Sequence, residues 1–168
     1  GVKAGPCENI NIQDNTIYHA HGGFVIGSEF SGGMKNIVVR NNTFQGTDAG
    51  LRFKSAVKRG GKSENIYIDH IYMTDITGDA ITFETTYFDN HVGAKHQAAP
   101  VKQEFLPDFQ DIHISNVYVR GCKNGIVAHG AEGMIHDITI KDSNIFYNKN
   151  AKDIDAACKI TLENVNFS

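Results

Sequence analysis

A short strand pattern that recurs six times restricts the fold of this 168-residue chain more than any other feature. Each copy carries aliphatic residues at its second and fourth positions, so both side chains point to the same side of a strand. A short polar stretch and then a further apolar residue follow each copy. The copies begin at Asn9, Asn36, Asn65, Asp111, Asp137 and Lys159.

The spacing of the copies predicts a solenoid. Successive copies start 27, 29, 46, 26 and 22 residues apart, and four of these five spacings fit one turn. The spacing of 46 predicts a loop insertion near residues 88–109. A second strand is expected in four of the turns, always after a small residue that permits a sharp corner. These second strands begin at Phe24, Leu51, Ile81 and Ile126.

One turn of such a chain cannot bury its own apolar side, whereas stacked turns form parallel sheets around a shared core. Segments with the period of a helix are nearly absent. The sequence therefore predicts an all-β fold, a parallel β-helix of about six turns, in a single domain over residues 1–168. The repeat also places Asn9, Asn36 and Asn65 at one position, where their amides are expected to hydrogen-bond along the axis.

Composition argues against several classes of partner. The net charge is −3 and no basic run stands out, so no nucleic-acid partner is expected. No apolar stretch approaches the roughly 20 residues of a membrane span, and no secretory signal is recognisable at the start of the chain. The histidines make no recognisable metal pattern, and no metal or cofactor is expected.

The three cysteines, Cys7, Cys122 and Cys158, fit buried free thiols. A disulfide between Cys122 and Cys158 is the alternative.

Arg52 and Lys54 are the first candidates for a binding site. They are two residues apart on a predicted strand and share its outward face, while Leu51 and Phe53 point inward. Two neighbouring cations suit a carboxylate ligand, because Arg offers a two-pronged fork and Lys a point charge. On spacing alone, the two cations are explained equally well as part of a solvated strand face with a nearby acid. The register of the repeat places Glu84 next to Lys54.

His21 and Tyr87 are the other candidates. His21 stands just before a predicted strand, and the two glycines that follow it let the backbone turn tightly and let a ligand approach. Such a histidine could orient or protonate a catalytic carboxylate, or it could be a corner residue bonded to backbone. His19 is the weaker of the two neighbouring histidines. Tyr87 lies just past the strand at residues 81–84 and could stack on a sugar ring or simply pack in a loop.

These residues resemble signatures of the polygalacturonase family of pectin-degrading glycoside hydrolases, family 28. That family carries Asn-Thr-Asp, Asp-Asp, Gly-His-Gly and Arg-Ile-Lys in this order. Ala20-His21-Gly22 is similar to the third signature, and Arg52-Phe53-Lys54 is similar to the fourth. The resemblance implies a right-handed parallel β-helix that hydrolyses α-1,4-linked galacturonan with inversion. In it, Arg52 and Lys54 would bind the galacturonate carboxylate, His21 would support the catalytic carboxylates, and Tyr87 would line the substrate subsite.

The resemblance carries one large departure. In the family, the aspartates that act as general acid and base lie in the first two signatures, and the 20 residues before His21 contain neither. The chain is therefore expected to be the C-terminal portion of such an enzyme, incomplete at the N-terminal end of the β-helix and inactive alone. The expected partners are pectin, polygalacturonate or oligogalacturonides, and the missing N-terminal turns. The resemblance places the protein in a secreted or periplasmic location.

Three alternatives stay open from the sequence. A related hydrolase could act on rhamnogalacturonan, although the Arg52 and Lys54 pair favours galacturonan. A pectate lyase also uses a β-helix, but it needs acidic calcium ligands clustered on one face. A non-catalytic β-helix that binds acidic polysaccharide, or that serves as an adhesin-like spacer, would explain the missing aspartates. Within the hydrolase reading, an insertion around residues 91–107 could block one end of the groove and favour an exo mode.

Overall fold

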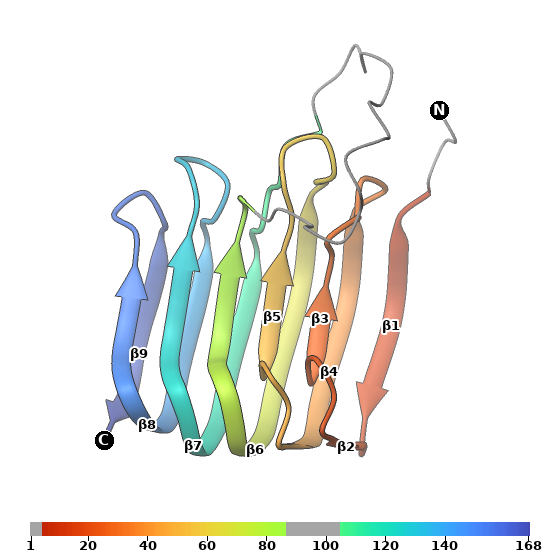
Figure 1. Ribbon diagram of the computed structural model, residues 1–168. Helices are drawn as coiled ribbons and strands as arrows, with labels where there is room; N and C mark the ends of the chain where they lie inside the picture. Colours follow the sequence, from red (N-terminus) through yellow and green to blue (C-terminus); the bar gives the residue numbers. More distant parts are fainter. Residues whose placement is uncertain (1–4, 87–104) are drawn as a thin grey trace, which may run out of the picture.

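The computed structural model describes residues 5–86 and 105–168. Within these ranges every regular element is a strand, and neighbouring strands run parallel (Figure 1). No helix in the described part of the chain is long and apolar enough to cross a membrane. The strands are β1 (Cys7–Gln13), β2 (Thr16–Tyr18), β3 (Phe24–Ile26), β4 (Met34–Gln45), β5 (Leu51–Lys54), β6 (Ser63–Glu84), β7 (Ile112–His129), β8 (Ile138–Ile154) and β9 (Ile160–Phe167).

The strands pair in three parallel ladders, and the long strands bend to pass from one ladder into the next. The first ladder contains β1, the beginnings of β4, β6, β7 and β8, and the beginning of β9. The second contains β2 and the following parts of the same long strands and of β9. The third contains β3, β5 and the ends of β6, β7 and β8, and its strands lie nearest the viewer in Figure 1. The chain thus winds as a parallel β-helix, as the repeat predicts.

The register of the ladders confirms the predicted repeat. The second residues of the six copies are aligned in the first ladder: Ile10, Ile37, Ile66, Ile112, Ile138 and Ile160. The apolar residues that follow the copies are aligned in the second: Ile17, Phe44, Met73, Val119, Ile145 and Phe167. Side chains of the interior turns, such as Ile66 and Met73, are fully buried, whereas the aligned side chains of β1 and β9 are only partly buried.

Near the beginning of β1, β4 and β6, one residue has a backbone conformation that few residues tolerate. Asn9, Asn36 and Asn65 have φ angles of 59°, 54° and 56°, in the left-handed region that asparagine adopts more readily than most residues. Asn36 Nδ2 donates to Asn9 Oδ1 at 3.0 Å, and Asn65 Nδ2 donates to Asn36 Oδ1 at 2.7 Å. The amide ladder predicted from the repeat is therefore confirmed.

Asp69 joins two neighbouring turns at the corner between the first and second ladders. Its Oδ1 accepts hydrogen bonds from Ser115 Oγ and Asn116 Nδ2, both at 2.8 Å, and its Oδ2 lies 2.6 Å from His70 Nδ1. Partial burial disfavours the charged carboxylate, but these hydrogen bonds outweigh that cost and lower the pKa of Asp69 to about 2. The ionised carboxylate is therefore the form that fits the folded chain.

Acidification is expected to destabilise the fold through Asp69. The pKa of Asp69 in the folded chain is below the ordinary value of about 3.9, so the folded state favours the ionised form more than the unfolded state does. This stabilisation is present above about pH 4 and is lost as the pH falls toward about 2. Urea unfolding midpoints measured across this range test the expectation. As the pH is lowered, the urea midpoint of the Asp69→Asn variant should fall less steeply than that of the native chain. If the midpoints of the two proteins fall in parallel, Asp69 does not cause the loss of stability.

The predicted insertion falls largely outside the described residues, and only its end, from residue 105 on, is described. Phe109 enters the core there with no exposed surface. Its ring stacks on Phe30, with centroids 4.9 Å apart, and meets Phe53 edge-on at 6.0 Å. Phe109 therefore anchors the segment before β7 to the core.

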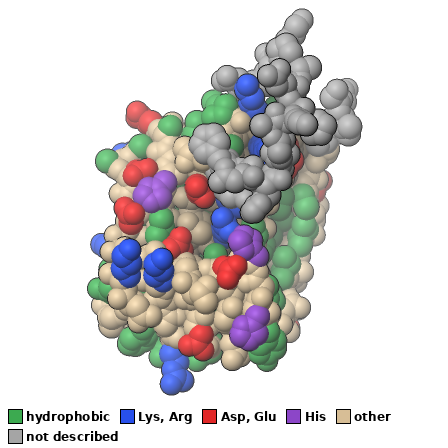
Figure 2. Space-filling model, in the orientation of Figure 1, with side chains coloured by type: hydrophobic (Ala, Val, Ile, Leu, Met, Phe, Trp, Pro, Cys, Tyr) green, Lys and Arg blue, Asp and Glu red, His purple; other side chains and the backbone are tan. Residues whose placement is uncertain are grey.

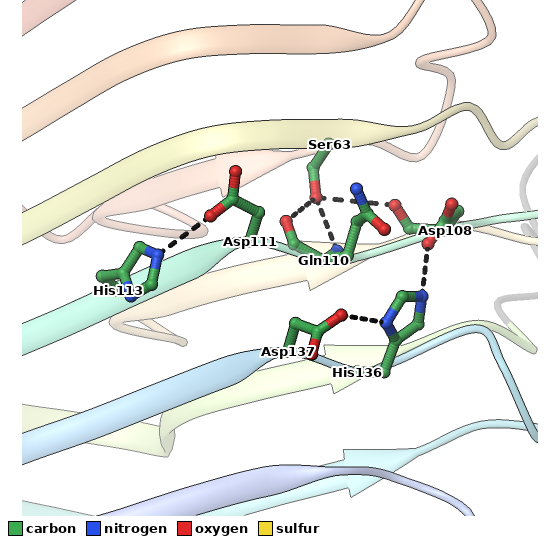
Figure 3. A network of polar contacts seen from close by, with 7 residues as sticks. All are labelled: Ser63, Asp108, Gln110, Asp111, His113, His136 and Asp137. Carbon is green, nitrogen blue, oxygen red and sulfur yellow. Dashed lines mark hydrogen bonds and ion pairs between the residues drawn. The ribbon is translucent and has the colours of Figure 1, made fainter.

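A polar network ties the same segment to the neighbouring turns (Figure 3). His136 Nε2 lies 3.0 Å from Asp108 Oδ1, and His136 Nδ1 lies 2.7 Å from Asp137 Oδ2. Ser63 Oγ accepts from the backbone N–H of Gln110 and donates to its carbonyl oxygen, both at 2.8 Å. Since Ser63, Gln110 and His136 belong to three successive turns, the network fixes the end of the insertion between its neighbours.

The cysteines are free thiols, with Cys7 exposed and the other two buried. The Cys122–Cys158 bridge that the sequence left open is therefore not formed. Cys122 Sγ lies 3.5 Å from the carbonyl oxygen of Phe146, and Cys158 Sγ lies 3.6 Å from that of Ala128. Burial raises the pKa of the Cys122 thiol to about 11, which keeps it protonated and unreactive.

Candidate functional site

The outward face of the third ladder carries the predicted cations. Leu51 and Phe53 of β5 are fully buried. The alternation of a strand then turns Arg52 and Lys54 outward, and both are partly exposed, as predicted. Figure 2 views this face and shows Lys and Arg side chains among Asp, Glu and His side chains. The face is therefore polar and mixed in charge.

The loop before β3 brings His21 to Arg52. Arg52 Nη1 lies 2.9 Å from His21 Nε2. Two residues after His21, Gly23 has no room for a side chain, because a Cβ there would lie 2.2 Å from the ring of Phe44. The N–H of Gly23 donates to the carbonyl oxygen of Gly50 at 3.1 Å. Glycine at this position thus lets the loop with His21 pack closely against the turn that carries Arg52.

Asp48 and Thr77 also belong to this site, and the sequence analysis missed both. His21 Nδ1 lies 2.8 Å from Asp48 Oδ2, and Thr77 Oγ1 donates to Asp48 Oδ1 at 3.3 Å. The hydrogen bond with His21 is the main cause that lowers the pKa of Asp48, and the charge of Arg52 adds to it. The missed signal was the repeat, since 27 residues separate His21 from Asp48 and 29 separate Asp48 from Thr77. These are the spacings of neighbouring turns.

The sign of the charge changes along the third ladder. Lys54 is aligned with Glu84 of β6, as predicted, and Glu84 is aligned with His129 of β7. His129 Nε2 lies 3.3 Å from Asp153 Oδ2, and His129 Nδ1 lies 3.2 Å from Asp155 Oδ1. The face thus runs from two cations on β5 to two carboxylates at the end of β8.

Of the two other candidates from the sequence, the structure describes only His19. Tyr87 lies outside the described residues. His19 occupies a corner with a φ of 48° and lies against Gly46, where an added Cβ would be 2.6 Å from His19 Nδ1. In residues 5–86 and 105–168, no group of three or more His, Cys, Asp and Glu side chains is arranged to hold a metal ion.

Comparison with known proteins places the chain among the glycoside hydrolases. The model of the family described as glycosyl hydrolases family 28 matches residues 1–165. The chain therefore belongs to glycosyl hydrolases family 28. The family resemblance carried by the residues around His21 and Arg52 is confirmed.

Relatives with curated descriptions are much longer than this chain. The chain is 32% identical over 129 residues to a polygalacturonase of Ralstonia solanacearum. The aligned region covers 74% of this chain and 22% of that protein. It is 30% identical over 118 residues to an exo-poly-alpha-D-galacturonosidase of Dickeya chrysanthemi. This second aligned region covers 70% of this chain and 19% of that protein. The chain thus spans about a fifth of the length of these relatives.

A solved structure supports the fold independently. The crystal structure of a hyperthermoactive exopolygalacturonase from Thermotoga maritima matches 97% of this chain with a TM-score of 0.82 and 30% identity. The match covers 35% of that protein's chain. The similarity identifies the fold as a right-handed parallel β-helix, as the sequence predicts.

Proposed function

We propose that the protein takes part in the hydrolysis of α-1,4-galacturonosyl linkages in pectin, with inversion, and that the outward face of β5 binds a galacturonate unit. The observation that carries the proposal is the pair Arg52 and Lys54 on one strand, with His21 within hydrogen-bonding distance of the guanidinium. Family membership and relatives named polygalacturonase support the substrate class. The ligands are pectin, polygalacturonate or oligogalacturonides.

The chemistry of the two cations fits a uronic acid. A guanidinium can grip both oxygens of a carboxylate, and an ammonium adds a point charge beside it. Phe53, between them on β5, is fully buried, so the strand that carries both cations is fixed to the core. We also propose that His21 stands next to the bound sugar and supports the catalytic site through Arg52. Tyr87, which lies outside the described residues, is proposed from the family resemblance to line the subsite.

The catalytic aspartates are proposed to lie on residues outside the given sequence. Inverting hydrolysis needs an acid and a base carboxyl group about 6.5–9.5 Å apart. We place them in β-helix turns that stack on β1, so that this chain alone is inactive. Ile10 and Ile12 of β1 are only partly buried, and this apolar surface suits another turn. The short span of this chain relative to its relatives also supports the proposal. We also propose a secreted or periplasmic location, on the basis of this substrate.

Calorimetry with trigalacturonate tests the binding face, and its methyl ester is the matched control because it keeps the backbone but loses the charge. We expect the chain to bind trigalacturonate, with an affinity that falls as salt is added, and to bind the ester much more weakly. Equal binding of the two ligands would contradict carboxylate recognition.

Release of reducing ends from polygalacturonate tests the catalytic part of the proposal. The chain as given should release none, and a longer protein that includes the preceding turns should release them. Robust turnover by the chain alone would refute the placement of the aspartates. No turnover by the longer protein, combined with binding of trigalacturonate, would identify a non-catalytic polysaccharide-binding β-helix instead.

A further inference from the structure

A chain of three hydrogen bonds runs across the candidate site and ends at Arg52. Thr77 Oγ1 donates to Asp48 Oδ1 at 3.3 Å, His21 Nδ1 lies 2.8 Å from Asp48 Oδ2, and Arg52 Nη1 lies 2.9 Å from His21 Nε2. Each of the four side chains stands on a different segment: the loop before β3, the segment before β5, β5 itself, and the interior of β6. The contacts therefore join three successive turns of the β-helix.

The chemistry of these groups fixes the position of the hydrogen on the imidazole. A guanidinium has only donors, so His21 Nε2 must accept the hydrogen bond from Arg52 through its lone pair. An ionised carboxylate has only acceptors, so His21 Nδ1 must carry the hydrogen that it donates to Asp48. Both neighbours therefore favour the same form, a neutral ring with its hydrogen on Nδ1.

We propose that Asp48 is a positioning residue that, held by Thr77, keeps His21 in this tautomer so that His21 Nε2 orients the guanidinium of Arg52. His21 then acts as a hydrogen-bond acceptor for Arg52, and its Nε2 carries no proton that it could give to a substrate. The positioning follows from the contacts alone. Only the purpose of an oriented guanidinium, to grip a galacturonate carboxylate, rests on the proposed function.

The nitrogen chemical shifts of the His21 ring test the tautomer directly, with no ligand present. In spectra recorded at about pH 8, where a free imidazole is neutral, the native chain should show a protonated Nδ1 and an unprotonated Nε2. Asp48→Ala should populate both tautomers. Asp48→Asn should keep the native form, because its Oδ1 accepts from His21 while its Nδ2 donates to the Thr77 hydroxyl. A native ring with its hydrogen on Nε2, or a spectrum unchanged in Asp48→Ala, would overturn the proposal.

Binding of trigalacturonate then tests what the positioning is for. Asp48→Ala should weaken binding about tenfold, as expected when one supporting hydrogen bond is lost, and Asp48→Asn should stay within about twofold of the native chain. If Asp48→Asn binds as weakly as Asp48→Ala, the charge matters and the positioning role is refuted. If the native chain shows the expected tautomer but binds no trigalacturonate, the proposed function fails while the positioning stands.

Discussion

Arg52→Ala is expected to weaken the binding of trigalacturonate by about 10- to 100-fold, which corresponds to the loss of hydrogen bonds to a charged group. The substitution removes the fork that would grip the carboxylate, and it also removes the donor that His21 Nε2 accepts. The remaining cation, Lys54, offers only a point charge. Isothermal titration calorimetry at low salt gives the dissociation constants of both proteins.

Two variants serve as controls for Arg52→Ala. Arg52→Lys keeps the charge but loses the planar fork, so its affinity should fall between those of the native chain and the alanine variant. Val38→Ala changes another exposed strand position, on the first ladder rather than the third, and should leave binding unchanged. If Arg52→Ala binds trigalacturonate as tightly as the native chain, β5 does not bind the carboxylate. That result would favour a β-helix that serves only as a spacer.

Phe109→Ala is expected to lower the free energy of unfolding by about 3–5 kcal/mol, the usual cost of removing a buried aromatic ring. The ring has no exposed surface, stacks on Phe30, and meets Phe53 and Phe83 edge-on, with centroids 6.0 and 6.4 Å away. Phe53 and Phe83 are themselves stacked at 4.5 Å, so the cavity would open in the middle of an aromatic cluster. Urea denaturation followed by far-ultraviolet circular dichroism measures the change.

Phe146→Ala is the matched control for Phe109→Ala. Phe146 is also an aromatic residue of the β-helix, but 42% of it is exposed, and its ring contact is with Tyr118 on the surface. Its replacement should cost no more than about 1.5 kcal/mol. Equal losses in the two variants would show that Phe109 does not anchor the core. Because Phe53 lies under the two cations, Phe109→Ala should also weaken trigalacturonate binding, whereas Phe146→Ala should not.

The ladders could be predicted because they depend on short-range patterns. Alternation with period two decides which side chains of a strand face inward, and it placed Arg52 and Lys54 on the outside of β5. A nearly constant spacing then decides which residues of successive turns are neighbours, and it aligned Lys54 with Glu84 and stacked the corner asparagines. The family resemblance of the residues around His21 and Arg52 added the hydrolase class, which the family match over residues 1–165 confirms.

The corners and the insertion could not be predicted in the same way. Asp48 and Thr77 lie where the chain turns between ladders, and alternation says nothing about the direction of a side chain there. His129 meets two aspartates that follow it by about one turn, and nothing in a scattered set of acids marks these two as its partners. The large spacing before Asp111 predicted an insertion, most of which lies outside the described residues, and it did not show that Phe109 is buried in the core.

By itself, the sequence determined that this chain stacks strands around a shared core and presents Arg52 and Lys54 on one outward face, because both properties follow from period and spacing. Only the tertiary structure decided that Arg52 meets His21 and that His21 meets Asp48. These contacts join different turns through side chains at corners. Their directions depend on how the turns pack against one another, which no local pattern contains.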